Sequence, residues 1–145
     1  MTDLRNYLSL IRKNNDLKTI KKSVSTKYEI AGITAKVDGS HAVFFENIKE
    51  SNFNLVSNLV GTRKRFAQAI GSTEKNIHEN IISAIKKAKK PKITSSGKFM
   101  ENHSRNLLIM PIVTHFEKES GPFITSSIVY VKNPDTGKQN SSFHR

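Results

Sequence analysis

Apolar residues near the start of the chain follow first a helical and then a strand-like spacing. A three–four spacing predicts an amphipathic helix that Thr2 caps and residues 14–16 end, with an inward stripe of Leu4, Tyr7, Leu8 and Ile11. Apolar and lysine residues then alternate loosely over residues 17–24, which predicts a short, half-exposed strand. The chain is therefore expected to open with a helix followed by a strand.

Helical spacing returns at residue 26 and then gives way to two strands. Thr26 and Glu29 stand at the distance of a capping box, and Gly39 suits the end of this helix, whose inward stripe is Ile30, Ile33 and Val37. Residues 41–46 and 53–60 are rich in apolar, β-branched and aromatic side chains. Each of these two segments is expected to form a strand.

Two further helices are predicted before the chain becomes irregular. Gly61 marks the turn into a helix over residues 62–70. Ser72 or Thr73 caps the next helix and Pro91 stops it, and its apolar positions are Ile77, Ile81, Ile82, Ile85 and Ala88. The other side of this last helix is rich in lysine, which is most simply explained as a solvated face.

The last third of the chain predicts a linker and then a β-hairpin. Residues 92–105 are polar and lack apolar periodicity, so we expect a loop between two folding units. Residues 107–112 begin the second unit, and the uncharged run over residues 123–131 predicts a strand. An Asn-Pro-Asp-Thr-Gly turn at residues 133–137 should lead into an antiparallel return strand over residues 138–145.

The return strand carries the candidate chemistry. Alternation places Asn140, Ser142 and His144 on one face, and Ser141, Phe143 and Arg145 on the other. The carbonyl oxygen of an asparagine side chain can bind a hard cation, and an arginine fork suits phosphate, carboxylate or a flavin edge. The simpler interpretation, which stays open from the residues alone, is that Asn140 is a strand-edge residue and Arg145 a solvated terminus.

Together these elements predict an α/β (α+β) fold in two parts. An N-terminal α/β domain is expected over residues 1–105, followed by the opening strands of a β domain over residues 106–145. Those last strands are too few to close a barrel. Without further strands, backbone edges would stay unpaired and one apolar face uncovered.

The amino-acid composition limits the classes of protein to which the chain can belong. The chain has 145 residues, of which 36% are hydrophobic and 25% charged, as in a soluble globular domain. The absence of cysteine excludes disulfides and thiolate metal sites. No apolar run approaches the ~20 residues of a membrane span. The first residues lack the pattern of a signal peptide, so a cytoplasmic protein is expected.

The net charge of +12 raises the question of an anionic partner. The lysines are spread along the whole chain, and no stacking aromatic residues are interleaved with the densest lysine clusters. The sequence therefore does not favour nucleic acid as the partner. A non-enzymatic basic module that binds an acidic partner or nucleic acid remains the alternative hypothesis.

Other kinds of catalytic site find no support in the sequence. The glycines are scattered, so there is no phosphate-cradling loop, and no nucleophile–base set is indicated. The histidines show no metal-ligand spacing; they are His41, His78, His103, His115 and His144. Glu117 and Glu119 are most simply a solvated pair.

Several motifs resemble the UbiD family of decarboxylases, which use prenylated FMN. Four stretches are similar to the segment that characterises the family. They are the His-Phe-Glu-Lys-Glu-Ser-Gly-Pro run at residues 115–122, Ile124-Thr125, the turn at 134–137, and Gln139-Asn140 followed by Arg145. The similarity extends upstream, at residues 4–5, 17–20, 30–34, 45–47 and 58–62 and at Arg65.

The resemblance implies specific roles for the return strand. Asn140 matches a ligand of a divalent metal, usually manganese, that holds the cofactor phosphate, and potassium is a further candidate ion there. Phe143, His144 and Arg145 match the stretch that contacts prenylated FMN, although Phe143 and His144 differ from the residues common there. Arg145 also matches a catalytic residue near the substrate carboxylate. The second domain would be the family's FMN-binding split β-barrel.

The implied reaction is non-oxidative decarboxylation of an unsaturated or aromatic carboxylic acid, a small-molecule substrate. The family's other metal ligands and its catalytic acid are expected beyond Arg145, so this chain alone is expected to be an inactive N-terminal fragment. A separately encoded C-terminal part is an open possibility, and the full-length family implies a homo-oligomer.

Overall fold

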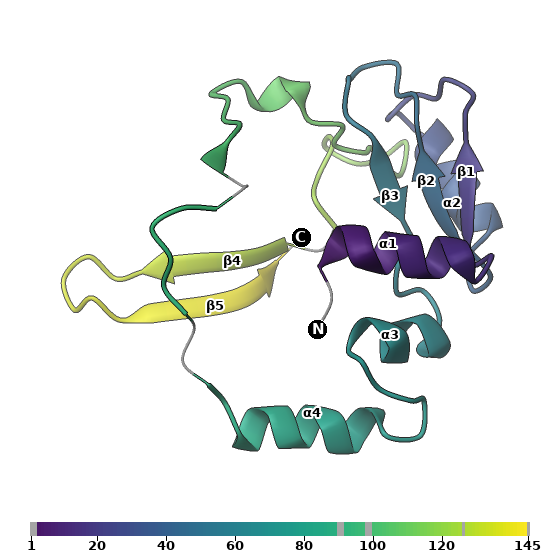
Figure 1. The fold of residues 1–145 in the computed structure, drawn as a ribbon. Helices are drawn as coiled ribbons and strands as arrows, with labels where there is room; N and C mark the ends of the chain where they lie inside the picture. The colour runs from purple at the N-terminus through teal and green to yellow at the C-terminus, as the bar shows by residue number, and fades with distance from the viewer. Residues whose placement is uncertain (1–2, 90–91, 98–99, 126, 145) are drawn as a thin grey trace.

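The computed structural model describes residues 3–89, 92–97, 100–125 and 127–144. The fold is mixed α/β. A three-stranded sheet with helices on both faces is followed by a long irregular segment and a separate two-stranded hairpin (Figure 1). No helix in the described part of the chain is both long and apolar enough to cross a bilayer.

The sheet has the order β1-β2-β3. Strand β1 (Leu17–Ile20) pairs in parallel with β2 (Ala42–Phe45), and β2 pairs antiparallel with β3 (Leu55–Ser57). A parallel pair needs a crossover connection, which helix α2 (Glu29–Lys36) provides.

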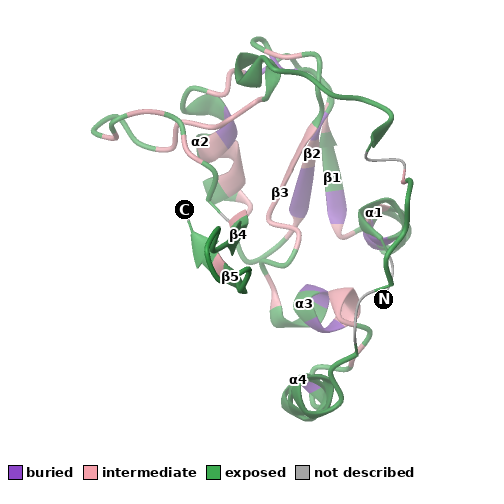
Figure 2. Ribbon diagram, turned by 90° about the vertical axis from the view of Figure 1, so that its left-hand side faces the viewer, coloured by how far each residue is buried: buried purple, intermediate pink, exposed green. Residues whose placement is uncertain are grey.

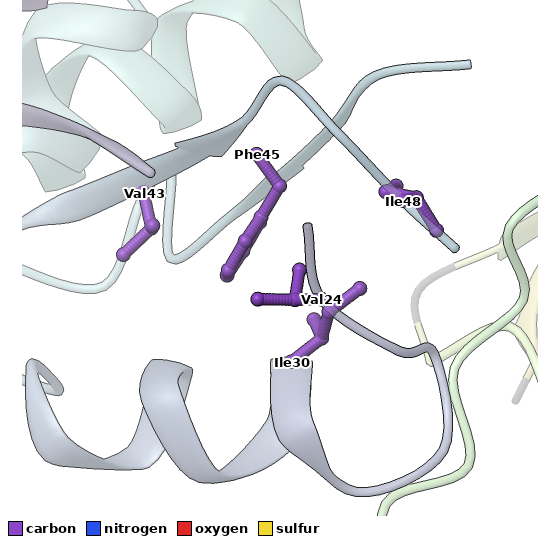
Figure 3. Close-up of a cluster of buried hydrophobic side chains, with 5 residues drawn as sticks. All are labelled: Val24, Ile30, Val43, Phe45 and Ile48. Carbon is purple, nitrogen blue, oxygen red and sulfur yellow. The ribbon is translucent and has the colours of Figure 1, made fainter. Parts of the chain in front are cut away.

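Alternation along β2 divides the core into two clusters. On one face α1 (Leu4–Lys13) packs against the sheet through Tyr7, Ile11, Leu17 and Ala42. On the other face α2 covers the cluster of Val24, Ile30, Val43, Phe45 and Ile48 (Figure 3). Figure 2 shows the sheet between the two helices, with most buried residues on its strands and on the inner sides of the helices.

Helix α1 agrees with the prediction except at its cap. The Oδ1 atom of Asp3 accepts the backbone N–H of Asn6 at 2.9 Å, so Asp3 is the cap. The predicted cap, Thr2, lies outside the described residues. The helix ends before Asn15, which has a left-handed backbone (φ 58°), as the asparagine-rich stretch predicted.

The predicted capping box at the start of α2 is wrong. Tyr28 occupies the cap position with φ 70° and makes no side-chain capping bond. Glu29 is the first helical residue, and its carboxylate instead accepts the backbone N–H of Ser25 at 2.6 Å. The backbone N–H of Thr26 donates to Glu50 at 2.9 Å. The carboxylate of Glu29 therefore stabilises the loop before the helix.

Two of the predicted strands are shorter than expected. Strand β1 ends at Ile20, and Val24 returns only as an isolated parallel bridge to Ile48. Strand β3 stops at Ser57 because Asn58 turns the chain with a left-handed backbone, φ 53°. The hydrophobic pattern alone did not predict where β1 and β3 end.

Helix α3 (Arg63–Ala69) begins after its cap Thr62, as predicted. Helix α4 (Ile77–Lys86) begins after Asn76, later than expected from Ser72 or Thr73. Ile77 is its one buried residue. The rest of its apolar stripe is exposed in the described structure, namely Ile81, Ile82 and Ile85.

The described part of the segment before the hairpin is largely irregular and includes the 3-10 helix η2 (Leu107–Ile109). It returns to the first sheet near α2. The backbone N–H of Thr114 donates to the carbonyl of Thr26, and the N–H of Tyr28 donates to the carbonyl of Thr114, both at 3.1 Å. Val113 packs against the α2-side core cluster. The domain boundary at residue 105 stays a prediction.

The C-terminal hairpin forms at the predicted turn, with strands β4 (Ser127–Lys132) and β5 (Gln139–His144). Strand β4 begins later than predicted, because residues 123–125 are irregular. Gly137 has φ 68°, which the turn requires and which glycine adopts without strain. Asn133, rather than Asp135, supplies the side chain that closes the turn. Its Oδ1 accepts the N–H of Asp135 at 2.9 Å.

Candidate functional site

The pairing of β4 with β5 assigns each hairpin side chain to a face, because directly opposed residues of an antiparallel pair point to the same side. Asn140 lies opposite Val131, Ser142 opposite Val129, and His144 opposite Ser127. We call this side the polar face. The other side, which we call the aromatic face, carries Ile128, Tyr130, Lys132, Gln139, Ser141 and Phe143. The predicted grouping of Asn140, Ser142 and His144 is confirmed.

Hydrogen bonds organise the far end of the polar face. The Nε2 atom of His144 lies 2.7 Å from Oγ of Ser142, and the hydroxyl of Ser127 donates to the carbonyl of His144 at 2.8 Å. Ser142 is partly buried, whereas Asn140 is exposed and its side chain makes no hydrogen bond within the described structure. Asn140 is thus available as a ligand.

The aromatic face is the more hydrophobic side of the hairpin. Phe143 is 84% exposed and Tyr130 is 77% exposed. The predicted cofactor contacts Phe143 and His144 therefore point to opposite sides of β5. A planar group lying against one face would meet only one of them. Arg145, predicted as both a cofactor contact and a catalytic residue, lies outside the described residues.

The described residues of the hairpin do not form a complete metal site. The polar face offers an amide oxygen, a hydroxyl and an imidazole, which are hydrogen-bonding groups. The part of the chain that the structure describes has no group of three His, Asp or Glu residues able to hold a metal ion. Asn140 offers one oxygen, whereas a hard cation takes about six ligands.

A large hollow lies elsewhere, between α2, β3 and residues 111–125. Its volume is about 960 Å³. Its lining is mostly apolar and includes Tyr28, Ile30, Leu55, His115, Phe123 and Thr125. The hollow extends to Thr125, which lies just before β4. Sequence reasoning did not predict it, because segments that are far apart in the chain form its walls.

His115 contributes the most polar ring to this hollow. Its ring centroid lies 5.2 Å from that of Phe123, and its backbone N–H donates to the carboxylate of Glu119 at 2.9 Å. The Nδ1 atom is buried and has no hydrogen-bond partner among the described residues. Glu119 therefore has a local structural partner.

Arg65 organises the loop along one wall of the hollow. Its guanidinium is almost fully buried and donates to the carbonyls of Ser40, Asn58 and Leu59 at 2.7, 3.2 and 3.3 Å. The Tyr7 hydroxyl lies 2.9 Å from the carbonyl oxygen of Arg65 and 3.1 Å from that of Leu59. Burial raises the pKa of Tyr7, while the nearby charge of Arg65 acts to lower it. We call this set of hydrogen bonds from the Arg65 side chain the Arg65 cage. No sequence pattern predicted it.

Two protein-family models match consecutive parts of the chain. The 3-octaprenyl-4-hydroxybenzoate carboxy-lyase N-terminal domain matches residues 8–85, and the Rift-related domain of the same carboxy-lyase matches residues 86–145. Together they cover almost the whole chain.

Curated relatives include decarboxylases. The chain is 29% identical to anhydromevalonate phosphate decarboxylase of Methanothermobacter thermautotrophicus, over 98% of this chain and 33% of that protein. It is 27% identical to one subunit of the 4-hydroxybenzoate decarboxylase of Chlamydia pneumoniae, over 100% of this chain and 29% of that protein. The chain thus spans about a third of the length of these relatives.

A solved structure has the same fold in its matching part. An evolved dimeric form of the UbiD-class enzyme HmfF from Pelotomaculum thermopropionicum, in complex with prFMN, superposes with a TM-score of 0.86 at 28% identity. The match covers 99% of this chain and 35% of HmfF. The family models, covering far more than half of the residues, show that this chain belongs to the UbiD family of carboxy-lyases.

Proposed function

We propose that the chain is the N-terminal part of a prenylated-FMN-dependent decarboxylase and contributes one strand of its cofactor site. The observation that carries this proposal is the polar face of β5, where Asn140, Ser142 and His144 form one row. The structure of HmfF with prFMN and the decarboxylases among the relatives support it.

The residues of β5 would divide the work of binding. Asn140 would provide one oxygen ligand to a divalent cation, for which we propose manganese, with potassium as the candidate second ion. The divalent cation would neutralise the cofactor phosphate. Arg145 would pair with the substrate carboxylate and orient it. When bound, prenylated FMN would supply the chemistry of non-oxidative decarboxylation.

Catalysis would require groups that the described residues lack. One amide oxygen does not complete a metal site, and the polar face carries no carboxyl group to protonate the product. We therefore propose that activity requires a further part of the enzyme, in the same polypeptide or encoded separately, and a homo-oligomeric assembly. The cytoplasm is the proposed location.

Two relatives support a choice of substrates to test. One acts on anhydromevalonate phosphate and another on 4-hydroxybenzoate. An unsaturated acid that carries a phosphate ester and a phenolic acid are therefore the two substrate types to assay first.

The competing function is a non-enzymatic basic module. It is favoured by the net charge of +12 and by the small number of ion pairs among described residues, which are Lys49–Glu29 and Lys64–Asp16. Such a module would bind an acidic protein or nucleic acid with strong salt dependence and would not require flavin.

Flavin reconstitution tests the proposed function. The purified chain is mixed with prenylated FMN and manganese, desalted, and assayed for bound flavin absorbance. Stoichiometric retention would mean that the chain builds the cofactor site without a further part. Without retention, the decisive sample is a chimera in which this chain replaces the matching third of HmfF.

The chimera should bind flavin and release carbon dioxide from a carboxylic acid substrate. Its Asn140→Ala variant should fold equally well, as judged by circular dichroism, yet lose most of its bound flavin. A folded chimera that binds no flavin would contradict the proposal.

A further inference from the structure

Helix α4 lies at the edge of the molecule, on the side of α3 that faces away from the sheet (Figure 1, Figure 2). Its residues Ile77, Ile81 and Ile85 are each four positions apart, so they form one apolar stripe along the helix. The exposed fraction rises along this stripe, from 4% at Ile77 to 37% at Ile81 and 73% at Ile85. Ile82, beside the stripe, is 51% exposed. The stripe is therefore buried where it begins and open to solvent where it ends.

The open end of the stripe leads into a dense run of lysine. Residues 85–93 read Ile-Lys-Lys-Ala-Lys-Lys-Pro-Lys-Ile. Ile93, which ends this run, is 93% exposed. The lysines that the structure describes here are exposed, and none forms an ion pair with another described residue; they are Lys86, Lys87, Lys89 and Lys92. Residues 81–93, which we call the lysine–isoleucine segment, thus present apolar and cationic side chains together.

We propose that the lysine–isoleucine segment binds the surface of an anionic lipid bilayer. Ile81, Ile82 and Ile85 enter the boundary between headgroups and acyl chains, and the lysines contact the headgroups. A helix with an apolar stripe and flanking lysines lies in the plane of such a surface. Each lysine close to an anionic leaflet strengthens binding about fivefold. This binding is independent of the proposed function, because it does not involve the hairpin or flavin.

The composition of the segment favours lipid over nucleic acid or protein. Residues 74–97 contain no arginine, phenylalanine, tyrosine or tryptophan. Nucleic acids are bound largely through arginine and stacked aromatic rings, and protein interfaces are enriched in the same residues and depleted of lysine. A bilayer surface requires neither, because aliphatic side chains enter its apolar part while lysine reaches the headgroups.

A second copy of the chain fits this surface poorly. Two copies that met through their α4 stripes would bring their lysine runs close together, and each copy carries a net charge of +12. An anionic leaflet instead neutralises these lysines while it covers the isoleucines.

Vesicle flotation tests the choice of partner. The 145-residue chain is floated with vesicles of phosphatidylcholine alone, or of equal parts phosphatidylcholine and phosphatidylglycerol. Binding to the anionic vesicles should be at least about tenfold tighter, and added salt should weaken it.

Two sets of three lysines provide a matched comparison. Replacing Lys86, Lys87 and Lys89 by glutamine should weaken binding to anionic vesicles about tenfold or more. The control replaces three exposed lysines at and just after β1, which removes the same charge and should weaken binding less than about threefold. These control residues are Lys18, Lys21 and Lys22.

Substitutions in the apolar stripe test insertion. Ile82→Gln combined with Ile85→Gln should weaken vesicle binding about tenfold and leave the melting temperature unchanged, because both side chains are exposed. The chain has no tryptophan, so Ile85→Trp introduces a single fluorescent reporter. Its emission should shift to shorter wavelength on anionic vesicles. The emission of Ser83→Trp, on the opposite side of α4, should not shift.

Equal binding to both kinds of vesicle, binding to neither, or equal losses in the two lysine sets would overturn the proposal, and so would unchanged binding of the isoleucine variant. Tighter binding to a single-stranded oligonucleotide than to anionic vesicles would assign this surface to nucleic acid instead. A blue shift of the Ile85→Trp variant that grows with protein concentration without lipid would assign it to a second copy. Loss of vesicle binding in the folded HmfF chimera would show that the rest of the enzyme covers α4, which would also overturn the proposal.

Discussion

The guanidinium of Arg65 donates a 2.7 Å hydrogen bond to the carbonyl oxygen of Ser40, twenty-five residues earlier in the chain. This bond joins the start of α3 to the loop before β2. Two further bonds from the same side chain reach the carbonyls of Asn58 and Leu59. One buried cation therefore connects three segments of the N-terminal unit through backbone carbonyls.

Replacing Arg65 by methionine should lower the free energy of unfolding by about 3 kcal/mol, because the substitution removes three buried hydrogen bonds of a charged donor. The Asn58 and Leu59 carbonyls keep the N–H of Gly61 and the Tyr7 hydroxyl as neighbours, so the Ser40 carbonyl is the one most affected. Urea unfolding followed by circular dichroism measures the loss. Arg63→Met is the matched control, since Arg63 is exposed and makes one bond, to the carbonyl of Glu74. Equal losses in both variants would contradict a special role for the Arg65 cage.

Tyr7 should make the stability of the chain sensitive to alkaline pH. Burial raises the pKa of its hydroxyl above the usual value of 10.0. The folded state therefore favours the protonated phenol. The contribution of Tyr7 to the free energy of unfolding is complete below pH 10 and is lost as the pH rises through the folded pKa. Over this pH range, the melting temperature should fall more steeply for the native chain than for Tyr7→Phe. At neutral pH the phenylalanine variant should be less stable by about 1 kcal/mol.

Glu50 should contribute to acid sensitivity. The hydroxyl of Ser25 and the backbone N–H of Thr26 hold the pKa of Glu50 below its usual value. Its contribution to stability is present above the unfolded pKa, near 4.5, and is lost as the pH falls through the lower folded pKa. Glu50→Gln should flatten the fall in melting temperature over this acid range. Glu46→Gln is the control, because the Glu46 side chain makes no hydrogen bond within the described structure.

Tyr28 has a backbone conformation that suits glycine. Its φ of 70° is rarely adopted by residues with a Cβ atom. Tyr28→Gly should therefore be more stable than Tyr28→Ala by about 1 kcal/mol, although both variants lose the ring. Thermal unfolding of the pair measures this difference. If alanine were the better replacement, the backbone strain inferred at this position would be absent.

The hydrophobic pattern predicted the helices, strands and C-terminal hairpin because each element buries one face or has a recognisable turn. The caps were harder to predict, since Thr26 and Glu29 have the spacing of a capping box and yet bond to Glu50 and Ser25. To predict a cap, the first residue of the helix must be known exactly. Here the hydrogen bonds of the preceding loop determine that residue.

The candidate site was predictable in part. The turn sequence and the two-residue period were enough to place Asn140 with His144 and apart from Phe143. The resemblance had grouped Phe143 with His144, because a sequence motif does not record the side to which each residue points. The hollow beside α2 and the Arg65 cage depend on tertiary contacts with carbonyl groups and distant segments, which have no signal in a local pattern.

The exposed hairpin has a consequence for handling the purified chain. Strands β4 and β5 form a two-stranded sheet, so the outer edges of both strands are unpaired in the described structure. Such edges act as templates for strands of other copies, particularly when apolar side chains flank them. Repulsion between copies that each carry +12 opposes this contact, and salt screens the repulsion. Colloidal stability should therefore decrease as ionic strength rises, so dilute buffer is the safer storage condition for this chain.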